Sequence, residues 1–472
     1  MKLPNKKLKE LFENVIKITF KNSAPKSKLS SEKQDLYKFE DDLYFSNKNF
    51  SSGALLLKQY ILDNIRKHKE EVNFFTSIEL LEYICKSIYI KIKSRVETIN
   101  DSLDIYLKSE DIDYGFTEIS RKLENSFGEY TIYFISNLLS LQDIDLVNIG
   151  KVSIKRIDKK IIEELPPIIE KPFFSNVYSP LQLELIEGDY LDPNRFIQEF
   201  EGKALFEVVI KGYQVNNEKS DVFEGALREF KYILSYFSIC KTFLKNVASD
   251  QYSIKTKEIK KDSKYGSKNN YQIYYLKDNK DPKILKELHI LSNYITLPEF
   301  AFIIDKASLE KIEKRCCLNN FNMIIQNGEF GTIGNKIKRS LDWVYKEMLE
   351  KDETDKAIAL FISLETLISY GHDPLIGLTD EYAENIAIMT HNNVEDRFNE
   401  KKYFKKKVYQ LRNDIMHNGY EVLWDKDWDK IERLKIYVAW ALRWFIKNID
   451  TLMKIGNNTN AVKEYFEREK LK

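Results

Sequence analysis

The sequence is poor in several residue types that mark specialised proteins. Among its 472 residues are 4 cysteines, 5 histidines, 10 prolines and 16 glycines. The cysteines are Cys85, Cys240, Cys316 and Cys317. They form no C-x-x-C pair, and histidine is too scarce to complete a zinc site by spacing, so we expect reduced thiols, no metal and no cofactor. The scarcity of proline and glycine favours long regular elements.

The chain also lacks targeting and membrane-spanning features. Its opening segment, MKLPNKKLKELFENVIKITF, is charged throughout and has no apolar core of the signal-peptide type. No window approaches the roughly 18 apolar residues that a membrane span needs. Charge is balanced, with 74 Lys+Arg against 73 Asp+Glu, so a surface that binds nucleic acid must be local. These absences predict a cytoplasmic protein without a membrane partner.

The residues that are present predict a folded protein of the α+β class, mainly α. Hydrophobic residues make up 43% of the chain and aromatic residues 13%. In region 1–165 the segments ALLLKQYILDNI and SIELLEYICKSIYIKI carry apolar residues at helical spacing, and YTIYFISNLLSLQDI is a third apolar stretch. We expect this region to be mainly helical. Five prolines between residues 166 and 193 predict a proline-rich joint over 166–199.

Residues 200–330 predict a mixed α/β region. The segments ALFEVVIKGYQV, NYQIYYLK and PEFAFIID are short, rich in β-branched or aromatic residues and bounded by turn formers, which is typical of strands. Between the first two lies a helical segment, ALREFKYILSYFSICKTFL, with one apolar face. That face is formed by Leu227, Phe230, Leu234 and Phe237. The glycine-rich NGEFGTIG predicts a linker to the last region.

Residues 331–472 predict a bundle of four helices. The helical segments are NKIKRSLDWVYKEMLE, TDKAIALFISLETLISYG, EKKYFKKKVYQLRNDIMH and WDKIERLKIYVAWALRWFIKNIDTLM. The second is apolar nearly all round, so we expect it to be buried, with Thr354 or Asp355 as its N-cap and Gly371 as its stop. The fourth carries an apolar seam for packing against other helices. The seam consists of Ile431, Leu434, Val438, Ala441, Phe445, Ile449 and Leu452.

The third of these helices ends in LRNDIMHNGY, which combines an arginine, an amide and a histidine. Asn413 and His417 are four residues apart and share a helical face, while Arg412 lies on the adjacent side within reach of a long side chain. Gly419 suits a left-handed C-terminal cap. His417 would then lie in the last turn, where the helix dipole favours a positive charge.

These three residue types suit the cleavage of RNA, which carries its own nucleophile, the 2′-OH beside the scissile phosphate. A histidine can move a proton at the reacting oxygens, an arginine can bind the phosphate as negative charge builds, and Asn413 can orient either group. Lysines cluster earlier on the same helix and could follow the RNA backbone. We assign RNA binding to Lys401, Lys405 and Lys406, with Lys405 roughly aligned with Arg412.

The motif RNDIMHNG, late in a helical region and preceded by ALFISLETLISYG, resembles the HEPN superfamily, with the Apea-like domains as the nearest branch. The resemblance covers about residues 330 to 460. It implies a metal-independent endoribonuclease that acts as a homodimer, leaves a 2′,3′-cyclic phosphate and serves as a toxin or antiviral defence effector. It places Arg412, Asn413 and His417 in the catalytic site, and it makes Glu365 the candidate to support the arginine.

Other interpretations of the same residues stay open. His417 could merely cap a helix while Arg412 forms a surface ion pair, or the region could be a non-catalytic HEPN module that binds a nucleotide or a protein partner. A metal enzyme is a weaker alternative, based on His372 and Asp373 in GHDP and on His391. No nucleotide-binding loop of the P-loop or Rossmann type is present. By analogy of arrangement alone, residues 1–330 would receive a trigger ligand or protein, select RNA or restrain the nuclease.

Overall fold

The computed structural model describes most of the predicted elements. The described residues are 6–20, 24–25, 36–39, 43–64, 74–93, 107–158, 161, 203–213, 221–248, 254–258, 273–278, 285–290, 300–326, 331–370, 377–456 and 458–470. The expected proline-rich joint at 166–199 lies outside them. The chain divides into two compact units, each described here by itself. The first comprises residues 1–131, 209–227 and 277–284, and the second comprises residues 132–208, 228–276 and 285–472.

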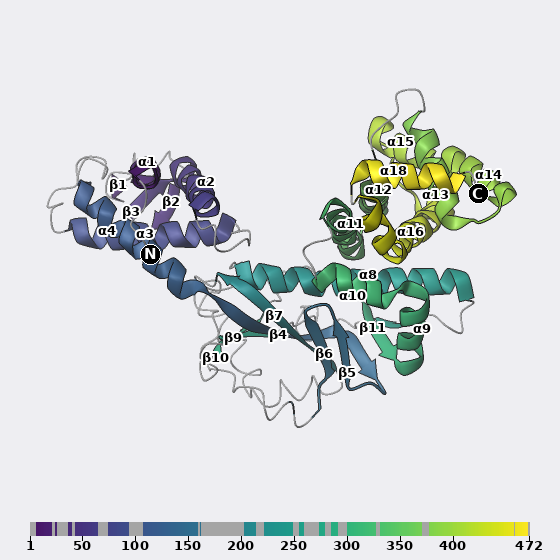
Figure 1. Ribbon diagram of the computed structural model, residues 1–472, viewed down its shortest axis with the longest axis horizontal. Helices are drawn as coiled ribbons and strands as arrows, with labels where there is room; N and C mark the ends of the chain where they lie inside the picture. Colours follow the sequence, from purple (N-terminus) through teal and green to yellow (C-terminus); the bar gives the residue numbers. More distant parts are fainter. Residues whose placement is uncertain are drawn as a thin grey trace. The chain divides into compact units, whose positions relative to one another are not determined.

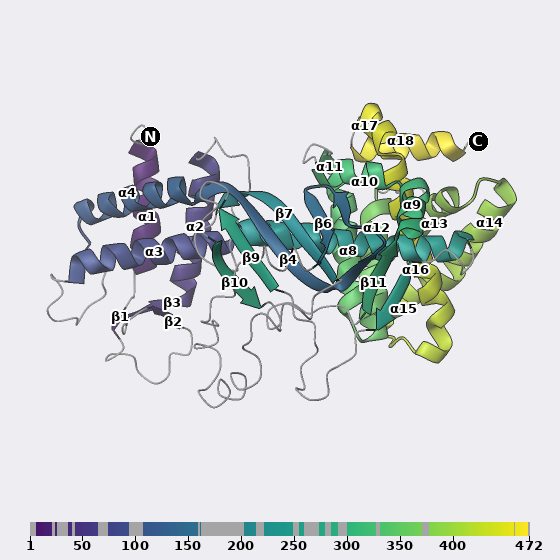
Figure 2. The ribbon, with the colours of Figure 1, turned by 90° about the horizontal axis from the view of Figure 1, so that it is seen from below.

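The first unit is built mainly from helices. Its helices are α1 (Lys6–Phe20), α2 (Asn47–Asn64), α3 (Phe74–Lys93) and α4 (Ser109–Ser126), and a small antiparallel sheet has the order β1 (Ala24–Pro25), β3 (Leu43–Ser46), β2 (Leu36–Phe39). The two helical predictions of this region are confirmed by α2 and α3. Figure 2 shows α2 and α3 grouped with α1 and α4. The apolar faces of the four helices meet in a core that includes Phe12, Leu81 and Ile84. Phe12 packs edge-on against Phe116, with ring centroids 5.4 Å apart.

From Phe127 the chain forms strands, so the expected mainly helical region ends at α4. The apolar stretch YTIYFISNLLSLQDI lies largely in β4 (Phe127–Gln142), which is followed by β5 (Leu146–Ile149) and β6 (Val152–Arg156). Ile132 and Phe134 are fully buried on β4. This segment forms a strand because isoleucine, tyrosine, phenylalanine and threonine fit a pleated surface. The sequence pattern did not reveal the strand, because a long apolar stretch that is buried on both faces has no clear period.

Five strands from residues after position 200 join β4, β5 and β6 in an eight-stranded sheet. They are β7 (Lys203–Tyr213), β8 (Lys255–Glu258), β9 (Ile273–Asp278), β10 (Leu285–Ile290) and β11 (Phe300–Asp305). The order is β10-β9-β4-β7-β6-β5, and β11 pairs with both β4 and β8. The β5–β6 and β6–β7 ladders are antiparallel, whereas β11 runs parallel to β4. The three strand predictions between residues 200 and 330 are confirmed by β7, β9 and β11.

Helix α8 (Asp221–Ala248) links the sheet to the C-terminal helices, and Figure 1 shows it running along the sheet on their side. On the sheet side, Phe230 lies 4.8 Å from Phe206 between ring centroids. On the other side, Tyr236 stacks on Phe321 at 3.9 Å. The predicted apolar face is buried, and so is most of the opposite side, because α8 is covered by two layers.

The described residues of the C-terminal region form helices joined by short turns, and together with the eight-stranded sheet they confirm the α+β, mainly α class. Its helices are α9 (Lys306–Cys316), α10 (Leu318–Gln326), α11 (Gly331–Leu349), α12 (Glu353–Ile368), α13 (Leu378–Thr390), α14 (Val394–Tyr403), α15 (Tyr409–Asn418), α16 (Trp424–Lys447), α17 (Ile449–Ile455) and α18 (Thr459–Lys470), with the π-helical η7 (Phe404–Val408) joining α14 to α15. The four predicted helices correspond to α11, α12, α14–α15 and α16–α17. Helices α9, α10, α13 and α18 were not predicted.

The predicted cap and burial of α12 and the predicted apolar seam of α16 and α17 have the following outcomes. The N-cap of α12 is Asp352 rather than Thr354 or Asp355, because the Asp352 carboxylate accepts the backbone N–H groups of both later residues at 2.8 and 3.1 Å. Helix α12 is buried along most of its length, as expected. The seven seam residues of α16 and α17 are at most 2% exposed, so this seam packs inside the chain.

Two expectations from composition bear on the described residues. The four cysteines are free, and three of them are buried. None of the helices within the described ranges combines the length and the apolar character needed to cross a membrane.

Candidate active site

The predicted motif lies at the end of one long helical run. Helix α14, the π turn η7 and α15 follow one another without a break from Val394 to Asn418. Within η7 the backbone N–H of Tyr409 donates to the carbonyl of Phe404, five residues earlier. This geometry inserts one extra residue into the turn and is often found at functional sites. It also changes the faces on which residues before and after it lie.

Gly419 ends the helix, as the sequence predicted. It adopts the left-handed conformation, with φ 63°, and its N–H donates to the carbonyl of Asp414. The N–H of Tyr420 donates to the same carbonyl at 3.1 Å. Such a cap satisfies carbonyls that the helix end would otherwise leave unpaired. His417 is therefore in the last helical turn.

Arg412 is held by Glu365 of α12, the acid that the resemblance singled out. Arg412 Nε donates to Glu365 Oε1 at 3.0 Å, and the two side chains are 20% and 25% exposed. Within the described residues the guanidinium makes no other hydrogen bond, so its two terminal nitrogens keep their donors. The ion pair fixes the arginine between two helices while leaving a fork that could bind a phosphate.

Two tyrosines form an aromatic wall beside this ion pair. The Arg412 guanidinium lies 5.6 Å from the ring centroid of Tyr409, and the Tyr382 ring meets that of Tyr409 edge-on at 6.1 Å. Burial raises the pKa of both phenols, and the Glu365 carboxylate adds to the rise. Both rings thus stay neutral at neutral pH, and Tyr409 contributes a cation–π contact to the position of Arg412.

Asn413 and His417 have a different setting. His417 is exposed and Asn413 is half-buried, and neither side chain has a hydrogen-bond partner among the described residues. Arg412 and His417 are five residues apart, which corresponds to roughly 7.5 Å along a helix axis and about 140° around it. The structure thus brings Arg412 to Glu365, but within one chain it does not bring Arg412 to His417.

The lysines assigned to RNA binding are only partly free. Lys405 Nζ lies 2.5 Å from Asp380 Oδ1, and Lys401 Nζ lies 3.8 Å from Glu384 Oε2, both acids being on α13. Lys406 is exposed and has no ion pair within the described part of the chain. The π turn explains the difference, because it breaks the seven-residue alignment between Lys405 and Arg412 that an uninterrupted α-helix would give.

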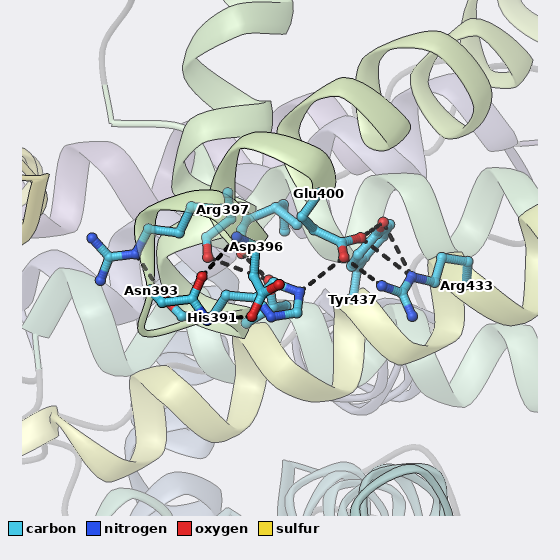
Figure 3. Close-up of polar contacts among 10 residues, drawn as sticks. His391, Asn393, Asp396, Arg397, Glu400, Arg433 and Tyr437 are labelled. Carbon is cyan, nitrogen blue, oxygen red and sulfur yellow. Dashed lines mark hydrogen bonds and ion pairs between the residues drawn. The ribbon is translucent and has the colours of Figure 1, made fainter.

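A second polar cluster, which the sequence analysis did not predict, fixes the first part of the same helix (Figure 3). Glu400 of α14 is 7% exposed and accepts from His391 Nε2 at 2.9 Å and from Arg433 Nε at 3.3 Å. The hydroxyl of Tyr437 also donates to it. We call these four side chains the Glu400 cluster. Its members come from the end of α13, from α14 and from α16, so it holds three helices together.

The charge state of Glu400 follows from these contacts. Burial by itself would raise the pKa of Glu400, but the hydrogen bonds from Tyr437, His391 and Arg433 outweigh it and hold the pKa below its ordinary value. All of its close partners are donors to the carboxylate. The Glu400 cluster is thus a saturated structural network that positions the motif helix. No local sequence pattern could have revealed it, because Arg433 and Tyr437 come from a distant helix.

The metal alternative finds no support among the described residues. No group of three or more His, Cys, Asp or Glu side chains there could hold a metal ion. His391 instead bonds Glu400, while His372 and Asp373 lie outside the described residues.

Comparison with known proteins gave no match: no family model, no curated protein and no solved structure is similar to this chain.

Proposed function

We propose that this protein is a metal-independent endoribonuclease of the HEPN type. The observation that carries the proposal is the Arg412–Glu365 ion pair of 3.0 Å, a pair that the HEPN resemblance implies. It leaves the terminal nitrogens of Arg412 available, while His417 is exposed at the capped end of the same helix. A histidine and an arginine are the groups that assist cleavage of an RNA phosphodiester by its own 2′-OH.

The proposed reaction needs no group from outside the protein and its RNA other than water. The 2′-OH of the substrate attacks the adjacent phosphorus, and the bond to the 5′-oxygen of the next nucleotide breaks. The 2′-OH gives up its proton as it attacks, and the leaving 5′-oxygen takes up a proton. Histidine can take up and release protons near neutral pH, so His417 makes one of these two transfers and water makes the other. Arg412 stabilises the extra negative charge on the phosphate, and Asn413 orients the histidine or the phosphate. The products are a 2′,3′-cyclic phosphate and a 5′-hydroxyl.

Arg412 and His417 of one chain lie on different sides of α15, and a homodimer would bring two such groups together. Two copies of α15 that face each other could place His417 of one copy near Arg412 of the other. Met416, next to His417, is 53% exposed and offers an apolar contact for such a pairing. The apolar seam of α16 and α17 is covered inside the chain, so it cannot form the dimer contact. We therefore place the proposed dimer contact at α15.

The biological role follows only from the family that the motif resembles. A toxin or antiviral effector would cut RNA of the cell or of an invader. Residues 1–330 would then receive the trigger or restrain the nuclease until it arrives.

The proposal is tested by incubating RNA with the full-length protein in EDTA. Wild type and a Gln410→Ala control, changed at an exposed residue of the same helix, should cut RNA and leave cyclic phosphate ends. His417→Ala and Arg412→Ala should each lose cleavage by roughly 100-fold or more, the usual scale for a lost acid–base or charge-stabilising group. Equal cleavage by wild type and His417→Ala would instead favour the non-catalytic module that binds a nucleotide or partner.

A further inference from the structure

A cavity of about 850 Å³ lies in the second unit, and none of the described residues lining it belongs to α15. Its walls come from the last turns of α8, the end of α11, the start of α12 and the first half of α16. Apolar side chains such as Leu360 and Ile436 form part of the lining. The volume falls within the roughly 300–1,000 Å³ that is typical of small-molecule sites.

Lysines project into this cavity from every wall. They are Lys241 and Lys245 of α8, Lys351 after α11, Lys356 of α12 and Lys435 of α16. Three glutamates, at positions 347, 350 and 432, also line it. Glu353, beside the lining, pairs with Lys356 at 2.7 Å. Five lysines thus face four carboxylates, and the cavity keeps a small net positive charge. Such a charge within a partly enclosed, apolar-lined space attracts anions.

Two of the three lining carboxylates lie close to one lysine, Lys435. Glu347 Oε1 lies 2.8 Å from Lys435 Nζ, and Glu432 Oε1 lies 4.0 Å from the same nitrogen. These contacts raise the pKa of Lys435 although its burial acts in the opposite direction. Burial lowers the pKa of Lys241, the charges of Lys245 and Lys435 lower it further, and the charge of Glu432 acts in the opposite direction. An anion bound beside Lys241 would relieve this repulsion.

The cavity also contains an aromatic surface. Trp428 lies on α16, seven residues before Lys435, so both point to the same side of the helix about two turns apart. Lys241 and Lys245 are one turn apart on α8 and face the same space. The lining thus offers a cationic end and an aromatic, apolar end.

We propose that this cavity binds a small phosphate ester that carries an aromatic or apolar group. The phosphate lies beside Lys241 and Lys245 of α8. The apolar part lies against Trp428 and the side chains of α12 and α16. A ligand in this position joins α8, next to the sheet, to the helices that carry the proposed active site. The inference does not depend on RNA cleavage.

Binding is tested with phenyl phosphate and inorganic phosphate as probes, by calorimetry and tryptophan fluorescence on the full chain. We expect phenyl phosphate to bind in a saturable way and more tightly than inorganic phosphate. Lys245→Met should weaken it by roughly tenfold or more, the usual effect of losing a charge-assisted hydrogen bond. The double change Lys241→Met and Lys245→Met should abolish it. Trp428→Phe should remove the fluorescence response.

The controls separate this site from the proposed active site and from general charge effects. Lys314→Met removes an exposed lysine of α9 and should bind phenyl phosphate like wild type. His417→Ala and Arg412→Ala should also bind normally. Lys245 is exposed, so its substitution leaves a folded protein even where the double variant does not. The proposal is overturned if no saturable binding occurs, if Lys245→Met and Lys314→Met bind equally, or if binding is lost in Arg412→Ala.

Discussion

Replacing Glu400 by glutamine tests how the motif helix is held in place. The substitution keeps the size of the side chain but removes the charge that accepts from His391, Arg433 and Tyr437. Glutamine would also turn an N–H group toward one of these donors. Removing one partner of a fully buried ion pair costs about 3–5 kcal/mol. Because Arg433 and His391 are 33% and 31% exposed, solvent offsets part of the loss.

We therefore expect Glu400→Gln to lower the free energy of unfolding of the C-terminal region by about 2 kcal/mol at neutral pH. Urea unfolding followed by tryptophan fluorescence measures this directly. All five tryptophans lie between positions 343 and 444, so the signal reports on the C-terminal helices. Glu421→Gln removes an exposed carboxylate and serves as the control, with an expected change of less than about 0.5 kcal/mol.

The pH dependence has a definite sign. The pKa of Glu400 in the folded protein lies below its ordinary value of 4.5, which applies to the unfolded chain. Its contribution to stability is therefore complete above about pH 4.5 and is lost as the pH falls through the folded pKa. The stability difference between wild type and Glu400→Gln should narrow below that pH. A difference within the control's range at neutral pH, or one that widens in acid, would refute this account of the Glu400 cluster.

Three further predictions concern the site itself. Glu365→Gln should lower RNA cleavage by roughly 10-fold or more while changing the free energy of unfolding by less than about 1 kcal/mol, because the pair mainly positions Arg412; unchanged cleavage would contradict that role. Gly419→Ala should destabilise the C-terminal region by about 1 kcal/mol in the same urea assay. The left-handed φ of 63° penalises any Cβ there, although no atom lies within 4 Å of the added carbon; equal midpoints would contradict a strained cap. Met416→Lys should shift the protein toward the monomer in light scattering and lower cleavage in parallel. A dimer that is unchanged by this substitution would show that the dimer contact does not lie at α15.

The sequence predicted the parts of the fold and site that depend on local pattern. The cap at Gly419 follows from the position of a glycine after the last periodic residue, and the buried seam of α16 follows from its repeat. For these two features a few neighbouring residues contain the whole signal. The pairing of Arg412 with Glu365 was a candidate only because the resemblance implies a polar residue on the preceding helix that supports the arginine, and Glu365 is the lone acid in that apolar run.

The missed features depend on distant partners or on weak local preferences. The strand β4 looked like one more apolar stretch, since its two buried faces leave no alternation to detect. The π turn at Phe404–Val408 has no distinctive composition, and it redirects lysines that a regular helix would have aligned with Arg412. Glu400 looked like an ordinary charge at the start of a lysine-rich helix. Only the packing of α16 against α14 gives it Arg433 and Tyr437 as partners.

The most direct test of the proposed function is cleavage of end-labelled RNA in EDTA by wild type and His417→Ala, prepared side by side. The account predicts that wild type produces fragments ending in a 2′,3′-cyclic phosphate, while His417→Ala, with an unchanged urea midpoint, leaves the RNA intact. Cleavage at the same rate by both proteins, or fragments that end in a 3′-hydroxyl, would contradict it.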